Sequence, residues 1–268
     1  MTVGVVRALI TVFGGGLLAA AVHAGSGMAV DGAGRVYFND TTRDIVYRIE
    51  ADSSLTVVAE DVHTNVLSIG PDGSLIYPPG GYPDGGYYFS IEAPDGSTYA
   101  TVYGMVVRVA EDGSRQRIAG DTVHGFRDGP VSKALFDRPL GLAIDSIGSI
   151  YVADHGNSRV RVITPDSMVK TVARAGWPWA PAGLTIAGER VYVLERLGKY
   201  GGLPILSRFF GFYLDHPRVR AIAADGSVGV VARVPVARAV PYAVTFLMVV
   251  VLIALVSAGV RARKRRDL

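Results

Sequence analysis

The chain has 268 residues, a net charge of +3 and no cysteine. The absence of cysteine excludes disulfides, thiolate zinc sites, haem attachment and a cysteine nucleophile. Five basic residues lie in the last eight positions, 261–268, and the rest of the chain is nearly neutral, so no nucleic-acid partner is indicated.

The first 24 residues have the pattern of a secretory signal. Arg7 precedes an uncharged run from Ala8 to Val22, and small residues follow at Val22 and Ala24. We expect residues 1–24 to be either a signal peptide cleaved after Ala24 or an uncleaved signal-anchor helix. Both alternatives place the following residues outside the cytoplasm.

The middle of the chain, residues 25–235, repeats itself. Residues 28–59 align without a gap with residues 142–173. Further copies, the fourth interrupted and the last partial, occupy 91–119, 183–195 continued at 218–232, and 67–77. Runs rich in Val, Ile and Tyr alternate with Asp-Gly turns in each copy, which indicates four short strands per unit. Repeating four-stranded units are typical of an all-β fold, the β-propeller.

Residues 121–163 resemble an NHL-repeat propeller blade with its leading connection. The matching residues are Gly125, Asp128, Gly129, Ala134, Phe136, Pro139, Gly141, Asp145, Gly148, Tyr151, Asp154, Asn157, Arg159 and Val160. The resemblance implies a propeller over most of 25–235. NHL propellers usually have six blades, whereas this chain shows four recognisable NHL-like blades plus a partial one.

A polar cluster follows one of the predicted strands. Asp154, His155 and Ser158 are the residue types of a catalytic triad, but side chains this close within one turn rarely converge on one point. Asp40 occupies the place of Asp154 in another unit, which favours turn chemistry repeated in each blade. The unit at 28–59 has other residue types at the positions of His155 and Arg159. We therefore predict that any binding function specific to this blade depends on these two residues.

Two further segments are candidate contact surfaces. Residues 78–88 are a Gly-rich, Tyr-rich segment that is either a contact surface for a partner, a plain long loop or a degenerate blade. Residues 203–217 form an apolar insertion that could dip into a bilayer, dock on a partner or belong to the core. The candidate binding residues are Tyr82, Tyr87 and Tyr88 in the first segment and Phe209, Phe210, Phe212 and Tyr213 in the second.

The C-terminal segment predicts a membrane anchor. Val240 to Val260 is an uncharged run of 21 residues, long enough for a helix to cross a bilayer. The basic tail 261–268 then marks the cytoplasmic side. We therefore expect a transmembrane helix within 236–260 and a single-pass protein of the cell membrane. Its propeller would lie outside the cytoplasm and its C-terminus inside.

These features predict an extracytoplasmic propeller that acts as a protein- or ligand-binding or scaffold module, with a protein partner and no cofactor. Such a module could be a subunit of a membrane complex. The alternative is a hydrolase or lyase of the lactonase-like sort, because some related propellers hold a divalent metal in the central channel. The histidines fall at scattered points with no ligand spacing, so the sequence assigns neither metal ligands nor catalytic residues.

Overall fold

The computed structural model describes residues 25–77, 89–93, 95–197 and 216–235. Among these residues, no helix has the length and hydropathy needed to cross a bilayer. The predicted signal or anchor (1–24), the three tyrosines of 78–88, the aromatic residues of 203–215 and the predicted transmembrane helix and tail lie outside the described residues.

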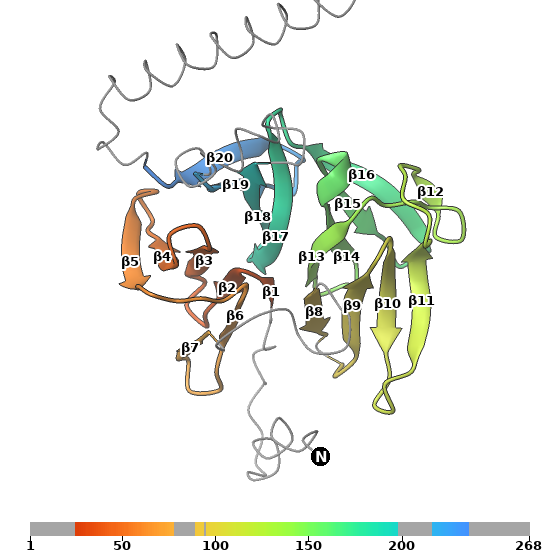
Figure 1. Ribbon diagram of the computed structural model, residues 1–268, viewed down its shortest axis with the longest axis horizontal. Coiled ribbons are helices and arrows are strands. Elements are labelled where there is room, and N and C mark those ends of the chain that lie inside the picture. The colour runs from red at the N-terminus through yellow and green to blue at the C-terminus, as the bar shows by residue number, and fades with distance from the viewer. Residues whose placement is uncertain (1–24, 78–88, 94, 198–215, 236–268) are drawn as a thin grey trace, which may run out of the picture.

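Four antiparallel blades surround a common axis, each with its strands in chain order from the inside outwards (Figure 1). Blade 1 contains β2 (Met28–Val30), β3 (Val36–Asp40), β4 (Ile45–Ile49) and β5 (Leu55–Ala59). Blade 2 contains β8 (Phe89–Glu92), β9 (Thr98–Val102), β10 (Met105–Val109) and β11 (Arg115–Gly120). Blade 3 contains β13 (Pro139–Ile144), β14 (Ile150–Asp154), β15 (Arg159–Ile163) and β16 (Met168–Arg174), with β12 (Gly129–Pro130) outermost. Blade 4 contains β17 (Trp179–Ala187), β18 (Arg190–Leu197), β19 (Arg218–Ile222) and β20 (Val228–Arg233). The prediction of an all-β propeller with four complete units is confirmed.

A fifth sheet has only three strands, and its inner strand comes from the N-terminal end of the described chain. It consists of β1 (Gly25–Ser26), β6 (Val66–Ile69) and β7 (Leu75–Ile76). The incomplete unit predicted at 67–77 is thus confirmed, but its third strand was not predicted. Besides pairing with β6, β1 lies against β8, β13 and β17, the inner strands of three blades. The chain itself therefore fills the axis of the ring (Figure 1).

The same irregularity recurs in all four blades. The pairing of the third strand with the fourth shifts register directly after the second residue of the third strand. A β-bulge places one extra residue in one of the two paired strands. Here the extra residue lies in the fourth strand of each blade; these residues are Val58, Ile118, Val172 and Val231.

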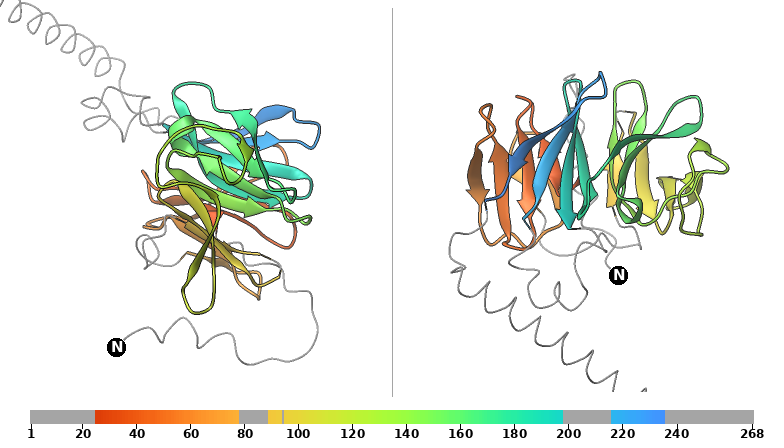
Figure 2. Two further views of the ribbon diagram at one scale, coloured as in Figure 1. Left: turned by 90° about the vertical axis from the view of Figure 1, so that its right-hand side faces the viewer. Right: turned by 90° about the horizontal axis from the view of Figure 1, so that it is seen from above.

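The antiparallel strands place two kinds of loop on opposite faces of the ring, as the view from above shows in part (Figure 2). We call the face made by turns 31–35, 50–54, 70–74, 93–97, 110–114, 145–149, 164–167, 188–189 and 223–227 the turn face. We call the opposite face, made by 41–44, 60–65, 103–104, the two ends of 121–138, 155–158 and 175–178, the connection face. The middle of 121–138 leaves this face, because β12 pairs with the first residues of β16 beside the turn 164–167. The short 3-10 helix η2 (His155–Asn157) belongs to the connection face.

Local hydrogen bonds explain the turn face. In many of its turns an aspartate side chain accepts the backbone N–H two residues later, and in five of them that residue is a serine. A glycine with positive φ often completes the turn, as Gly73 does at +80°. The hydrophobic core lies between neighbouring blades, with Phe136 and Phe38 fully buried.

The position of β1 depends on one close approach. Gly27 has a φ of +69°, and a Cβ there would lie 2.2 Å from Oδ1 of Asn39. Asn39 in turn donates its backbone N–H to Gly27 O (2.9 Å) and its side-chain amide to Thr64 O. Asn39 therefore holds the residue that follows β1 through its backbone, and the connection that leads into β6 through its carboxamide.

We predict that Gly27→Ala destabilises the fold more than Gly34→Ala. Gly34 has a similar φ of +78° but open space around its Cβ position. A left-handed backbone at a non-glycine residue lowers the free energy of unfolding by about 1–2 kcal/mol, and this loss applies to both variants. Overpacking against Asn39 adds about 1–3 kcal/mol for Gly27→Ala only. Denaturant unfolding of the full chain in detergent measures both, and equal losses would show that Asn39 yields freely.

Candidate functional site

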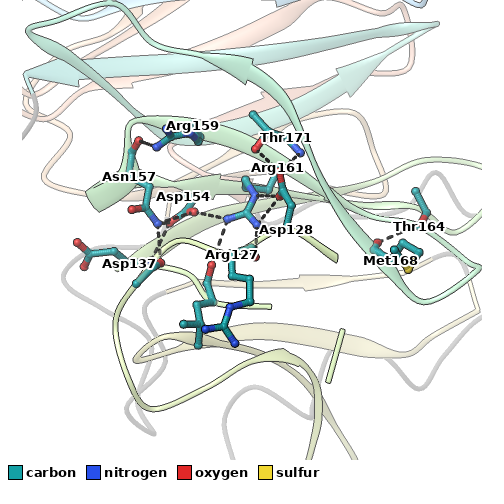
Figure 3. Close-up of polar contacts among 12 residues, drawn as sticks. Arg127, Asp128, Asp137, Asp154, Asn157, Arg159, Arg161, Thr164, Met168 and Thr171 are labelled. Atoms are coloured by element: carbon teal, nitrogen blue, oxygen red, sulfur yellow. Dashed lines mark hydrogen bonds and ion pairs between the residues drawn. The ribbon is translucent and has the colours of Figure 1, made fainter. Parts of the chain in front are cut away.

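The polar cluster of blade 3 is centred on a carboxylate with no exposed surface. Asp154 ends β14 and is 0% exposed. One of its oxygens accepts the backbone N–H of Asp137 at 2.8 Å, and the other accepts Nη1 of Arg161 at 2.8 Å. Nδ2 of Asn157 donates to the same carboxylate at 2.9–3.0 Å (Figure 3). The carboxylate is therefore fully used in holding the protein together.

Arg161 is the second half of this network and is also 0% exposed. Its Nε donates to Asp128 at 2.8 Å, and its other nitrogens donate to the carbonyls of Leu135 (3.2 Å) and Arg127 (2.7 Å). Its guanidinium also lies 5.0 Å from the ring centroid of Phe136. Arg161 thus fastens the connection 121–138, which arrives from blade 2, onto the third strand of blade 3 (Figure 3).

Burial raises the pKa of the Asp154 carboxyl to about 6, although the hydrogen bonds from Asn157, the Asp137 N–H and Arg161 lower it. A perturbed carboxyl can indicate an acid–base catalyst. Here the side chain has no exposed surface, so it cannot touch a substrate. The raised pKa reflects the cost of enclosing a carboxylate, which the arginine and the amides largely offset.

Asp154, His155 and Ser158 each have separate hydrogen-bond partners. Nδ1 of His155 donates to the carbonyl of Pro181 at 3.0 Å. Ser158 has a left-handed backbone, with a φ of 53°, and its N–H bonds to His155 O. However, the Asp154 side chain does not cap the backbone of its own turn, and within that turn its carboxylate bonds only to the Asn157 side chain among the described contacts. That part of the turn interpretation was wrong.

His155 and Arg159 both lie on the connection face, half-buried. Burial lowers the pKa of His155, and the nearby Arg138 and Arg196 lower it further, against the Pro181 carbonyl. Arg159 donates to Asn157 O at 2.8 Å and lies over the ring of Phe126 at 4.0 Å. Their predicted binding role stays a prediction. Tyr82, Tyr87, Tyr88, Phe209, Phe210, Phe212 and Tyr213 lie outside the described residues.

A buried carboxylate recurs at the same register in two other blades. Asp40 of blade 1 pairs with Arg43 at 2.6 Å. Glu195 of blade 4 pairs with Arg218 at 2.7 Å and with Arg220 at 2.9 Å. In blade 2 the place is taken by Val102, which is buried among apolar neighbours. The repetition indicates a structural role for these carboxylates.

Three surface hollows formed by described residues lie on the turn face, where the sequence suggested no site. One, of about 450 Å³, lies in blade 2 between the turns at 93–97 and 110–114, and Asp95, Ser97 and Arg108 line it. A second, of about 380 Å³, lies where blades 1 and 4 meet. A third, of about 210 Å³, lies between blades 2 and 3. No local motif marks them, because they form between turns that are distant in sequence or belong to different hairpins.

Within the described ranges, no group of three or more His, Cys, Asp or Glu side chains is arranged to hold a metal ion.

We predict that Arg161→Met lowers the free energy of unfolding by about 3–5 kcal/mol, because it leaves the Asp154 carboxylate buried without its cation. The matched change Arg159→Met should cost no more than about 1 kcal/mol, since Arg159 is half-buried and donates one described hydrogen bond. Adding Asp154→Asn to Arg161→Met should recover part of the loss, because no charge is then buried alone. Thermal unfolding of the full chain measures all three, and equal effects of the two arginine changes would contradict the central role of Arg161.

Comparison with known proteins gives a match to one family model and several similar solved structures. Residues 136–163 match the family model of the NHL repeat. No curated protein matches the chain. Similar solved structures include an auxiliary nutrient binding protein from Bacteroides thetaiotaomicron (17% identity, TM-score 0.35, 59% of this chain and 42% of that one). Others are a streptogramin B lyase (10%, 0.36, 78% and 83%) and a gluconolactonase from Xanthomonas campestris (16%, 0.39, 80% and 77%).

The chain spans less than half the length of the first of these structures. The match to the NHL model falls on blade 3, from Phe136 in the leading connection to the end of β15. The protein therefore carries an NHL repeat as one blade of a four-bladed β-propeller.

Proposed function

We propose that the protein is a membrane-anchored, extracytoplasmic β-propeller that acts as a protein- or ligand-binding or scaffold module within a membrane complex. One observation carries this proposal: β1 lies on the axis of the ring, against β6, β8, β13 and β17. The chain itself occupies the axis of the ring, where a propeller could hold a small molecule. Binding would then take place on the turn face or the connection face.

The turn face is the surface that we propose for recognition. Its hollows are lined by carboxylates, hydroxyls and guanidinium groups, with Arg108 donating to Ser97 at 2.7 Å. Such a surface offers hydrogen bonds to a polar segment of a partner protein. No nucleic acid and no cofactor form part of the proposal.

The membrane anchoring rests on the sequence. The uncharged run 240–260, the basic tail 261–268 and the signal pattern of 1–24 support a single-pass protein of the cell membrane. In this arrangement the ring lies outside the cytoplasm and the C-terminus inside.

The proposed recognition surface can be tested by charge reversal on either face. We expect a companion chain to co-purify with the full-length protein from native membranes in mild detergent, and Arg108→Glu to lose it. Arg174→Glu makes the same charge change at an exposed residue of the connection face and should retain the companion. Loss with both variants, or no companion of the wild type, would contradict binding through the turn face.

The alternative of a metal-dependent hydrolase or lyase predicts a different response to cations. A resident ion at about 100 times its Kd would add about 2.7 kcal/mol of stability. We expect the Tm of the full chain in detergent to be the same in calcium, magnesium or zinc as in sodium chloride of equal ionic strength. A cation-specific rise in Tm that EDTA reverses would favour the enzyme.

A further inference from the structure

The exposed aromatic side chains of the described residues gather at the connection face. Trp177 is 80% exposed, Tyr103 is 61% exposed and Phe126 is 44% exposed, and all three lie in its loops. The fourth exposed aromatic residue, Tyr77, follows β7, a strand that runs towards this face. Exposed aromatic groups on one side of a protein usually mark a contact.

These aromatic residues are spread over one face instead of forming a single cluster. Tyr103 belongs to a turn of blade 2, Phe126 to the connection between blades 2 and 3, and Trp177 to the connection between blades 3 and 4. A pocket for one small ligand would gather them at one point. Aromatic rings distributed at one level are typical of a membrane–water interface, where Trp and Tyr are enriched.

The turn face carries the opposite kind of surface. Every described turn on it contains an aspartate or a glutamate. Hydrogen bonds from the serine two residues later hold the pKa of four of these carboxyls below the usual range, so they stay ionised; these are Asp52, Asp72, Asp112 and Asp225. An anionic bilayer would repel this face.

Ion pairs occur on both faces. On the turn face Asp31 pairs with Arg35 and Glu50 pairs with Arg48, each at 2.6 Å. On the other side of the ring Asp44 lies 2.9 Å from Nδ1 of His63. Exposed basic residues, Arg127 and Arg174, add positive charge to the connection face. Glu60 and Asp61 are exposed there as well, in the sector of blade 1, where the described residues include no exposed aromatic side chain.

The chain leaves the ring at the connection face. β20 runs from the turn face to this side, where the N–H of Val234 donates to Pro217 O at 3.1 Å. Only four residues, 236–239, separate Pro235 from the first residue of the uncharged run at Val240. Five peptide steps reach at most ~18 Å. A ring anchored through this run is therefore held with its connection face close to the membrane surface.

We propose that the connection face lies on the bilayer, with Tyr103, Phe126 and Trp177 at the interface and its basic side chains against anionic lipid phosphates. This inference rests on the proposed membrane anchoring. It assigns the two faces different tasks, because the turn face and its hollows then point away from the membrane towards a partner.

The absence of cysteine makes a direct test possible. Val123→Cys on the connection face and Ile147→Cys on the turn face each introduce one thiol at a well-exposed position, 64% and 75% exposed in the native chain. Each full-length variant is labelled with a nitroxide and reconstituted into vesicles of equal parts phosphatidylcholine and phosphatidylglycerol containing a trace of nickel-chelating lipid. Nickel at the head groups relaxes only spins close to the bilayer surface.

We expect the label at 123 to relax several-fold more strongly than the label at 147. Equal relaxation, or the reverse order, in a chain that floats with the vesicles would overturn the orientation and leave the anchoring intact. A chain that does not float would overturn the anchoring and the orientation together.

A second comparison tests the chemistry of the contact. Trp177→Ser combined with Tyr103→Asn should lower the relaxation at 123 while flotation is unchanged; asparagine suits position 103 because its φ is +55°. Vesicles of phosphatidylcholine alone should also lower it, because the anionic lipid is gone. If neither the double substitution nor the loss of anionic lipid changes the relaxation at 123, the short linker alone sets the distance between the face and the bilayer. That result would overturn the proposed lipid contact.

Discussion

Three blades depend on a buried carboxylate at the end of their second strand. Asp40, Asp154 and Glu195 occupy equivalent places, and each is at most 1% exposed. A carboxylate in such a place is tolerated only where a cation and further donors meet it. The third residue of the third strand supplies a cation in two of these blades, where Arg161 pairs with Asp154 at 2.8 Å and Arg220 pairs with Glu195 at 2.9 Å.

This constraint explains why the polar residues of blade 3 are not available for chemistry. Asp154 and Arg161 form hydrogen bonds with the connection from blade 2. His155 donates its Nδ1 hydrogen to the carbonyl of Pro181 in the inner strand of blade 4. The side chains that a triad would need therefore already form the hydrogen bonds that join neighbouring blades. Recognition is left to side chains at the two faces, whose chemistry differs.

The sequence predicts what is local and misses what is distant. The repeats locate all four blades because strand alternation and Asp-Gly turns are written within a few residues, and β2 to β5 span 28–59 as expected. The role of Arg161 could not be predicted, because its partners Asp128, Leu135 and Arg127 lie 26 to 34 residues away in the sequence. β1 escapes prediction for a similar reason: two residues, Gly25 and Ser26, carry no periodicity.

The difference between the two faces follows from the same local rules. In a ring of antiparallel blades all hairpin turns between paired first and second strands, and between third and fourth, fall on one side. Aspartate is favoured in those turns because it accepts the backbone N–H two residues on, so the turn face becomes acidic without any partner. The buried carboxylates lie at the other ends of the strands and require arginines there. A sidedness that could orient the ring on a charged membrane is thus a product of how its blades fold.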